Sequence, residues 1–169
     1  MMQLQSHIDT IDPDCIAFLG DALYHGPRNR IKPDYDPRGT AEIFNGLKER
    51  IVAVRGNCDS EVDQMIIAFP ILSEYTTILD EKRRFFLSHG HIWCPEKLPP
   101  VPTGTILVNG HTHVSAIEQI DSSVIYFNPG SISLPKNDQP PSFGLYDGRR
   151  LSVLNLDGAQ EILALELPA

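Results

Sequence analysis

Two histidines separated by one residue directly follow an apolar stretch of the chain. Residues 105–108 are β-branched or apolar and predict a buried strand, and Gly110 permits a sharp turn at its end. Because side chains two positions apart in an extended segment point the same way, His111 and His113 are expected to reach one place. Two converging neutral imidazoles suit a divalent metal ion. A surface pair or a hydrogen-bonded core pair has the same spacing, so the pair alone leaves these alternatives open.

Three more glycine-containing turns with metal-ligand residues follow other predicted strands. These turns are Gly20-Asp21, Gly56-Asn57 and His89-Gly90-His91. In α/β sheets, binding sites lie beyond the carboxyl ends of strands, so all four turns are expected to meet in one crevice. Each turn alone is equally compatible with a structural role. Their coincidence at four strand ends favours a metal site, whose oxygen and nitrogen donors suit manganese, iron, zinc, magnesium or nickel.

Hydrophobic spacing predicts the elements that position these turns. An amphipathic helix is expected at 1–11, a second helix leads into a strand at 51–54, and Ser60 with Asp63 predicts a capping box. A hairpin is expected around the charged turn at 80–83. Further strands are predicted at 15–19, 116–120, 124–127, 143–146, 151–156 and 162–167. The expected result is one domain spanning residues 1–169, an α/β sandwich of two sheets with outer helices.

Composition excludes several classes of protein. The 169 residues contain no apolar run of the ~20 residues that a membrane helix needs, and the first residues do not resemble a signal peptide. Three widely spaced cysteines argue against a disulfide framework and predict a cytoplasmic location. The net charge of −8 argues against non-specific nucleic-acid binding. It does not exclude a phosphate substrate, because bound divalent cations would invert the local charge. Nothing in the composition indicates an oligomeric state.

The order of the four turns resembles the calcineurin-like metallophosphoesterase superfamily. Finer segments are similar to its bacterial YfcE-type phosphodiesterase branch: Tyr24-His25-Gly26-Pro27-Arg28-Asn29, Arg55-Gly56-Asn57-Cys58-Asp59 and Asn128-Pro129-Gly130-Ser131. The resemblance covers the chain from Met1 onward. It implies a four-layer αββα sandwich and hydrolysis of a small phosphodiester at a dinuclear metal site, most often holding two Mn(2+) ions.

The resemblance also implies a role for each ligand-type residue. Asp21 would bridge both ions, Asn57, His89 and His111 would complete one site, and His113 would bind the other ion. His91 lies beside the ligand position and is expected either to contact a metal ligand without binding the ion or to be structural.

Four further residues are candidates for contact with substrate. Arg28 and Arg55 could clamp phosphate oxygens, with a solvated loop arginine and an ordinary ion pair as the alternatives. Cys58 occupies the position at which many members of the superfamily have a histidine that protonates the leaving group. Its alternative role is that of a small buried side chain that fills space. His25 or a metal-bound water is a candidate substitute for that histidine.

One motif of the resemblance has no counterpart in this chain. Members of the superfamily begin with a strand that ends in Asp-x-His. The Asp and the His of this motif bind the same ion as the residue corresponding to His113. Without this motif, one ion has four protein ligands and the other has two, Asp21 and His113. Three interpretations follow: an impaired phosphodiesterase, a non-catalytic metal-binding scaffold like the retromer-coat branch of the superfamily, or a start site assigned one strand too late. We favour the last, because a central strand supplies ladder hydrogen bonds and core surface that a marginally stable fold needs.

Overall fold

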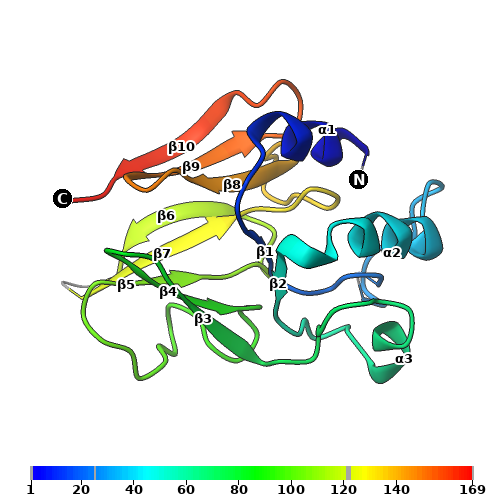
Figure 1. Ribbon diagram of the computed structural model, residues 1–169, viewed down its shortest axis with the longest axis horizontal. Coiled ribbons are helices and arrows are strands. Elements are labelled where there is room, and N and C mark those ends of the chain that lie inside the picture. Colours follow the sequence, from blue (N-terminus) through cyan, green and yellow to red (C-terminus); the bar gives the residue numbers. More distant parts are fainter. Residues whose placement is uncertain (1, 25, 121–122, 169) are drawn as a thin grey trace.

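The structure is a computed structural model that describes residues 2–24, 26–120 and 123–168 (Figure 1). Its helices are α1 (Met2–Ile11), α2 (Pro37–Gly46), the 3-10 helix η1 (Lys48–Arg50) and α3 (Glu61–Gln64). Its strands are β1 (Ile16–Phe18), β2 (Ile51–Ala53), β3 (Tyr75–Leu79), β4 (Arg84–Ser88), β5 (Thr105–Val108), β6 (Ser115–Gln119), β7 (Val124–Pro129), β8 (Ser142–Tyr146), β9 (Arg150–Asn155) and β10 (Glu161–Glu166). The mixed α/β class is confirmed, and each predicted strand is present.

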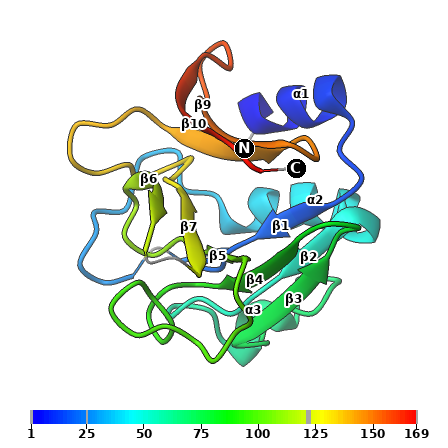
Figure 2. The ribbon, with the colours of Figure 1, turned by 90° about the vertical axis from the view of Figure 1, so that its left-hand side faces the viewer.

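The strands form three hydrogen-bonded sheets rather than the two expected. The largest has the order β3-β4-β5-β7-β6, the second has the order β10-β9-β8, and β1 pairs in parallel only with β2. In Figures 1 and 2, α1 lies beside the β8–β10 sheet, and α2 lies beside β1 and β2. β4, β5 and β7 run parallel, so β4 and β5 end at the same edge of their sheet.

Local capping interactions explain where two helices begin. Asp36 accepts a hydrogen bond from the backbone N–H of Gly39 at 2.9 Å and precedes Pro37, whose fixed φ suits a first helical turn. Ser60 and Asp63 form the predicted capping box, with the Ser60 N–H donating to Asp63 Oδ2 at 2.8 Å. Both caps lie in segments adjoining the loops that carry candidate ligands.

Apolar side chains cover both faces of β5. Ile106, on one face, belongs to a core that includes Leu151 and Val153 of β9, and all three are fully buried. Leu107, on the other face, packs in a cluster with Phe86 and Tyr126. Burial on both faces explains the continuous apolar sequence of this strand. It also gives the turn that follows β5 a rigid base.

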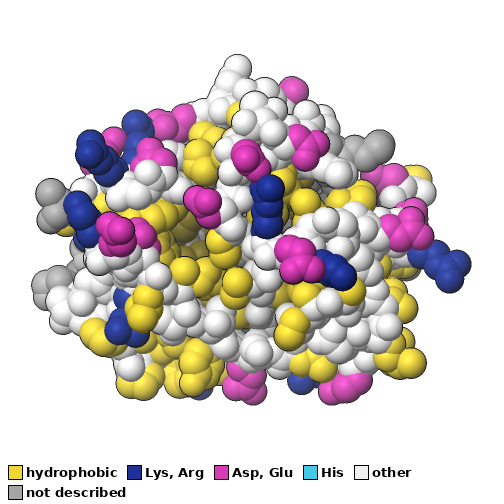
Figure 3. Space-filling model, in the orientation of Figure 1, with side chains coloured by type: hydrophobic (Ala, Val, Ile, Leu, Met, Phe, Trp, Pro, Cys, Tyr) yellow, Lys and Arg dark blue, Asp and Glu magenta, His cyan; other side chains and the backbone are white. Residues whose placement is uncertain are grey.

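Charged side chains are interspersed on the face shown in Figure 3, and none of the described histidines is visible there. The candidate histidine ligands therefore do not open onto this face. Within the described ranges, no helix combines the length and apolar content needed to cross a membrane.

Candidate metal centre

Asp59 holds together the two loops that follow β1 and β2. Its side chain, in a residue only 3% exposed, accepts backbone hydrogen bonds from Asp21 at 2.8 Å, Gly56 at 2.7 Å and Ala22 at 2.7 Å. The loops approach so closely that a Cβ on Gly20 would lie 2.4 Å from the Gly56 nitrogen. Only glycine fits there, particularly at the φ of +95° that Gly20 adopts. This packing fixes the backbone of Asp21 beside the turn that carries Asn57.

His89, at the end of β4, is the centre of the candidate ligand group. Its Nδ1 lies 2.6 Å from the carbonyl oxygen of Leu19, which can only accept, so Nδ1 carries the proton. Its Nε2 lies 3.1 Å from Asn57 Oδ1, 3.1 Å from His111 Nδ1 and 3.5 Å from Asp21 Oδ2. Four of the five predicted ligand residues are therefore brought together around a histidine that is 2% exposed.

The chemistry of these atoms suits a cation. In a neutral His89, Nε2 presents a lone pair, and it faces an amide oxygen and a carboxylate oxygen that cannot donate a proton. Donor atoms bound to one ion at ~2.1 Å lie roughly 3.0–3.4 Å from one another, close to the spacing seen here. No three histidine, cysteine or carboxylate side chains in the described part of the chain form a ready-made metal cluster. The close approaches instead centre on His89 Nε2 and include an asparagine.

His111 and His113 adopt a different backbone from the one predicted. Their φ angles are +59° and +61°, in the left-handed region, so the extended segment expected here is wrong. The buried Asn128 holds this turn by donating hydrogen bonds to the Gly110 carbonyl at 2.8 Å and to Thr112 Oγ1 at 3.0 Å. Both histidines nevertheless line one cavity of about 50 Å³ together with Asp21 and Asn57.

The two histidines are suited to bind a metal in their neutral form. Burial, followed by the nearby His89, lowers the pKa of His111, and burial also lowers the pKa of His113. His113 Nδ1 donates to the Leu134 carbonyl at 2.8 Å, which leaves the lone pair on Nε2. The ring of His111 approaches His89 directly, whereas the ring of His113 is hydrogen-bonded to the Leu134 carbonyl.

The predicted substrate-binding residues separate into two groups. Arg28 and Cys58 line the cavity. Arg55 instead donates from Nε to the Asp59 carbonyl at 3.2 Å and lies 3.8 Å from Glu61, as its ion-pair alternative predicted. His25 lies outside the described residues.

Cys58 is a protonated thiol at neutral pH. Burial and the Asp21 carboxylate raise its pKa to about 11. Its backbone N–H donates to Asp21 Oδ1 at 2.9 Å, and its sulfur accepts from the Asn57 side chain at 3.1 Å. The thiol is therefore placed beside the candidate ligands but is a weak proton donor.

His91 differs from the residues that line the cavity. It is exposed, and its ring centre lies 5.3 Å from that of His89 and 6.1 Å from that of His111.

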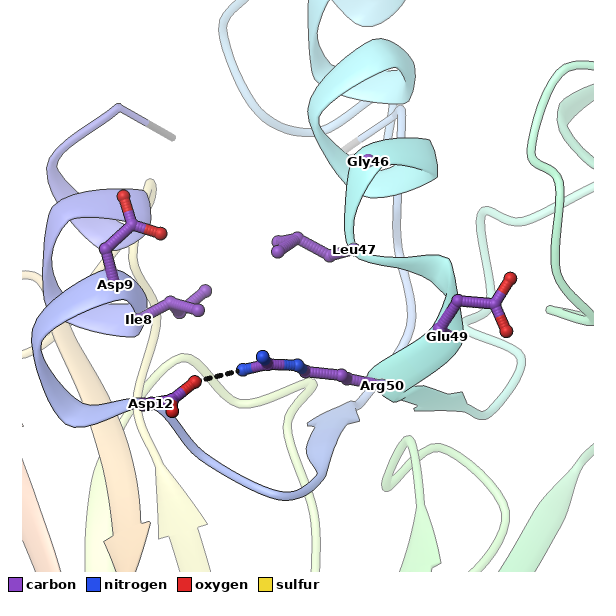
Figure 4. A pocket seen from close by; sticks show the side chains of 7 residues that line it. All are labelled: Ile8, Asp9, Asp12, Gly46, Leu47, Glu49 and Arg50. Atoms are coloured by element: carbon purple, nitrogen blue, oxygen red, sulfur yellow. Dashed lines mark hydrogen bonds and ion pairs between the residues drawn. The ribbon is translucent and has the colours of Figure 1, made fainter.

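A second cavity, of about 300 Å³, lies between α1 and the end of α2 (Figure 4). Ile8 and Leu47 line it, and the ion pair between Arg50 and Asp12, at 2.6 Å, closes one end. None of the predicted ligands lines this larger cavity.

Sequence reasoning missed two residues of the site. Asp59 appeared only as part of a motif, and its three backbone contacts span up to 38 positions of sequence. Lys136 also lines the cavity, in the β7–β8 loop and five residues beyond the segment Asn128-Pro129-Gly130-Ser131. A local signal in the sequence is the pair of turn-favouring residues that follows it, Asn137 and Asp138.

Comparisons with known proteins identify the family of this chain. Residues 2–150 match the calcineurin-like phosphoesterase superfamily domain. Phosphodiesterase YfcE of Escherichia coli K12 is 47% identical over 149 residues, which is 88% of this chain and 80% of that protein. The structure of Yfce, a phosphoesterase from E. coli, superposes with a TM-score of 0.95 at 40% identity, over 99% of this chain and 91% of the other.

A more distant structure shares the fold alone. Vacuolar protein sorting 29 from Cryptosporidium parvum superposes with a TM-score of 0.64 at 18% identity, over 100% of this chain and 89% of the other. The family of the chain follows from two findings: the family model matches residues 2–150, and phosphodiesterase YfcE is 47% identical. The chain belongs to the calcineurin-like phosphoesterase superfamily.

Proposed function

We propose that this chain is a metal-dependent phosphodiesterase whose active site is the cavity beside His89. The observation that carries the proposal is the approach of three donor atoms to His89 Nε2 at 3.1–3.5 Å. The 47% identity to a protein named as a phosphodiesterase supports the reaction class.

The residues present fit a divalent ion of the manganese type. Asn57, His89 and His111 would hold one ion, Asp21 would bridge to a second, and His113 would bind that second ion. When bound, such ions neutralise developing phosphoryl charge and activate water as a nucleophile. Zinc, iron, nickel and magnesium are compatible with the same donors. The second ion would receive only two ligands, Asp21 and His113, from the described residues and is expected to bind less tightly.

The protein side chains around the ions would position the substrate. Arg28 has an exposed guanidinium at the cavity, where it can bind two oxygens of one phosphate. A thiol with a pKa near 11 releases its proton reluctantly, so Cys58 gives little help to a poor leaving group. We therefore expect activated aryl phosphodiesters to be hydrolysed slowly with manganese and alkyl phosphodiesters barely at all. His25 stays a candidate proton donor.

A hydrolysis assay tests this function. The protein is incubated with bis-para-nitrophenyl phosphate, with and without manganese, and compared with Asp21→Asn. Asp147→Asn is the matched control, because that carboxylate is exposed and lies in the turn before β9. Manganese-dependent turnover that Asp21→Asn abolishes and Asp147→Asn preserves is the expected result. Turnover no faster than with free manganese would contradict the proposal and support the alternative, a non-catalytic metal-binding scaffold.

A further inference from the structure

The loop between β7 and β8 forms one wall of the candidate active site. It contacts the His113 segment through two hydrogen bonds: His113 Nδ1 donates to the Leu134 carbonyl at 2.8 Å, and the Lys136 N–H donates to the His113 carbonyl at 3.1 Å. The main chain at position 136 is therefore held directly beside a candidate metal ligand.

A tight turn fixes this loop from its other end. Gln139 N–H donates to the Lys136 carbonyl at 3.1 Å, and Asn137 and Asp138 both have positive φ, at +54° and +56°. These angles define a turn of the type I′ class. The Gln139 side chain then accepts from the Ser115 N–H at 2.6 Å, so the turn is attached on both sides to the segment carrying His113.

No hydrogen bond or ion pair to a described residue explains the position of the Lys136 side chain. It lines the cavity of about 50 Å³ and is exposed. No side chain or carbonyl in the described ranges accepts a hydrogen bond or forms an ion pair with its ammonium group. In contrast, Lys32 in the facing loop donates to the Ser133 carbonyl, and the Lys97 ammonium lies 5.2 Å from the Trp93 ring centre. Lys136 is thus a positioned cation without a counter-charge of its own.

Arg28 is a second cation on the same cavity and lies near a different residue. Its charge acts on Cys58, whereas the charge of Lys136 acts on His113. A cavity of this volume holds roughly a few water molecules, so it is too small for the two ester substituents of a substrate. A phosphate bound there would lie within reach of both cations.

We propose that Lys136 is a substrate-binding residue whose ammonium binds a non-bridging oxygen of the phosphodiester on the His113 side of the cavity. The inference rests on the proposed function, since it takes the same cavity as the active site. A lysine binds as a point charge, so its contribution depends on charge rather than on a planar fork. Arginine at this position should therefore preserve much of the binding.

Three variants test the inference: Lys136→Met, Lys136→Arg and the control Lys82→Met. Lys82 is an exposed lysine in the β3–β4 turn, so its loss changes the net charge equally. We expect Lys136→Met to raise KM for bis-para-nitrophenyl phosphate about tenfold with little change in kcat, the size expected for one charge-assisted contact. The Kd for inorganic phosphate, measured with manganese present, should rise by about the same factor. Lys136→Arg should stay within about threefold of the unmodified protein, and Lys82→Met should match it.

Two results separate this inference from the proposed function. If the unmodified protein hydrolyses the diester with manganese but Lys136→Met leaves KM and the phosphate Kd unchanged, the assignment of Lys136 is wrong and the function stands. If no variant shows manganese-dependent hydrolysis, the proposed function fails. In that event the assignment of Lys136 is tested by the Kd for inorganic phosphate alone. Weaker phosphate binding by Lys136→Met, with unchanged binding by Lys136→Arg and Lys82→Met, supports the assignment. Phosphate binding by Lys136→Met equal to that of the unmodified protein overturns it. Because the side chain is exposed, all three variants should retain the melting temperature of the unmodified protein.

Discussion

Replacing Asp59 by asparagine should weaken both the fold and the metal centre. The Asp59 carboxylate accepts three backbone hydrogen bonds, two of them on Oδ2, from Asp21 and Gly56. An amide placed with its oxygen at Oδ2 keeps those two bonds. Its NH2 group then faces the N–H of Ala22, where two donors oppose each other. Either orientation of the amide therefore leaves at least one buried backbone donor unsatisfied.

The expected loss of stability follows from the number of buried donors that the amide leaves unsatisfied. One unsatisfied buried donor costs about 1–3 kcal/mol, and the two remaining bonds lose their charge assistance. Removal of the charge offsets part of this cost, because burial raises the pKa of Asp59 and so disfavours its ionised form in the folded protein. A net loss of about 2 kcal/mol is expected, which at an m-value of about 2 kcal/mol/M lowers the urea midpoint by roughly 1 M.

Urea unfolding and manganese titration of Asp59→Asn measure the two effects, with Asp147→Asn as the control. The Asp147 carboxylate also accepts two backbone N–H groups, from Arg149 and Arg150, but it is exposed and water can replace it. The manganese Kd of Asp59→Asn should rise about 10–100-fold, as for other residues that orient metal ligands. An Asp59→Asn midpoint and manganese Kd equal to those of the control would refute the positioning role.

Three further outcomes are expected. His111→Ala should abolish most manganese binding while His91→Ala changes it little, as measured by calorimetric titration; equal losses would show that the ligand was wrongly chosen. Thiol alkylation at Cys58, followed by peptide mass spectrometry, should be slow at pH 8 and accelerate toward a pKa near 11, and fast reaction at pH 8 would contradict its burial beside Asp21. Because the pKa values of His111 and His113 lie below the ordinary 6.5, the unfolded chain binds more protons as the pH falls through 6.5 and below. Stability and manganese affinity should therefore both decrease in that window, and chemical denaturation with manganese titration at pH 5 to 8 checks the sign.

Local sequence signals predicted much of the fold. The capping box at Ser60 and the hairpin around residues 80–83 depend on neighbouring residues, so both are visible in the sequence and both are present. The division into three sheets depends on pairings between distant strands, which hydrophobic spacing does not specify.

The sequence predicted which residues lie at the candidate site better than it predicted the backbone conformation that positions them. Strand ends brought Asp21, Asn57 and His89 together as expected from α/β topology. The left-handed turn at His111 was not predicted, because Asn128, from another strand, holds its backbone. Lys136 was not predicted for a related reason: a tertiary contact with His113 places it at the cavity.

Manganese titration of the purified protein, stripped of metal and followed by calorimetry, tests the central claim most directly. The ligand arrangement predicts one ion bound tightly and a second bound more weakly, with the tight site lost in Asp21→Asn and retained in the exposed control Asp147→Asn. Tight binding that survives Asp21→Asn, or no binding at all by the unmodified protein, would contradict the assignment of this cavity as a metal centre.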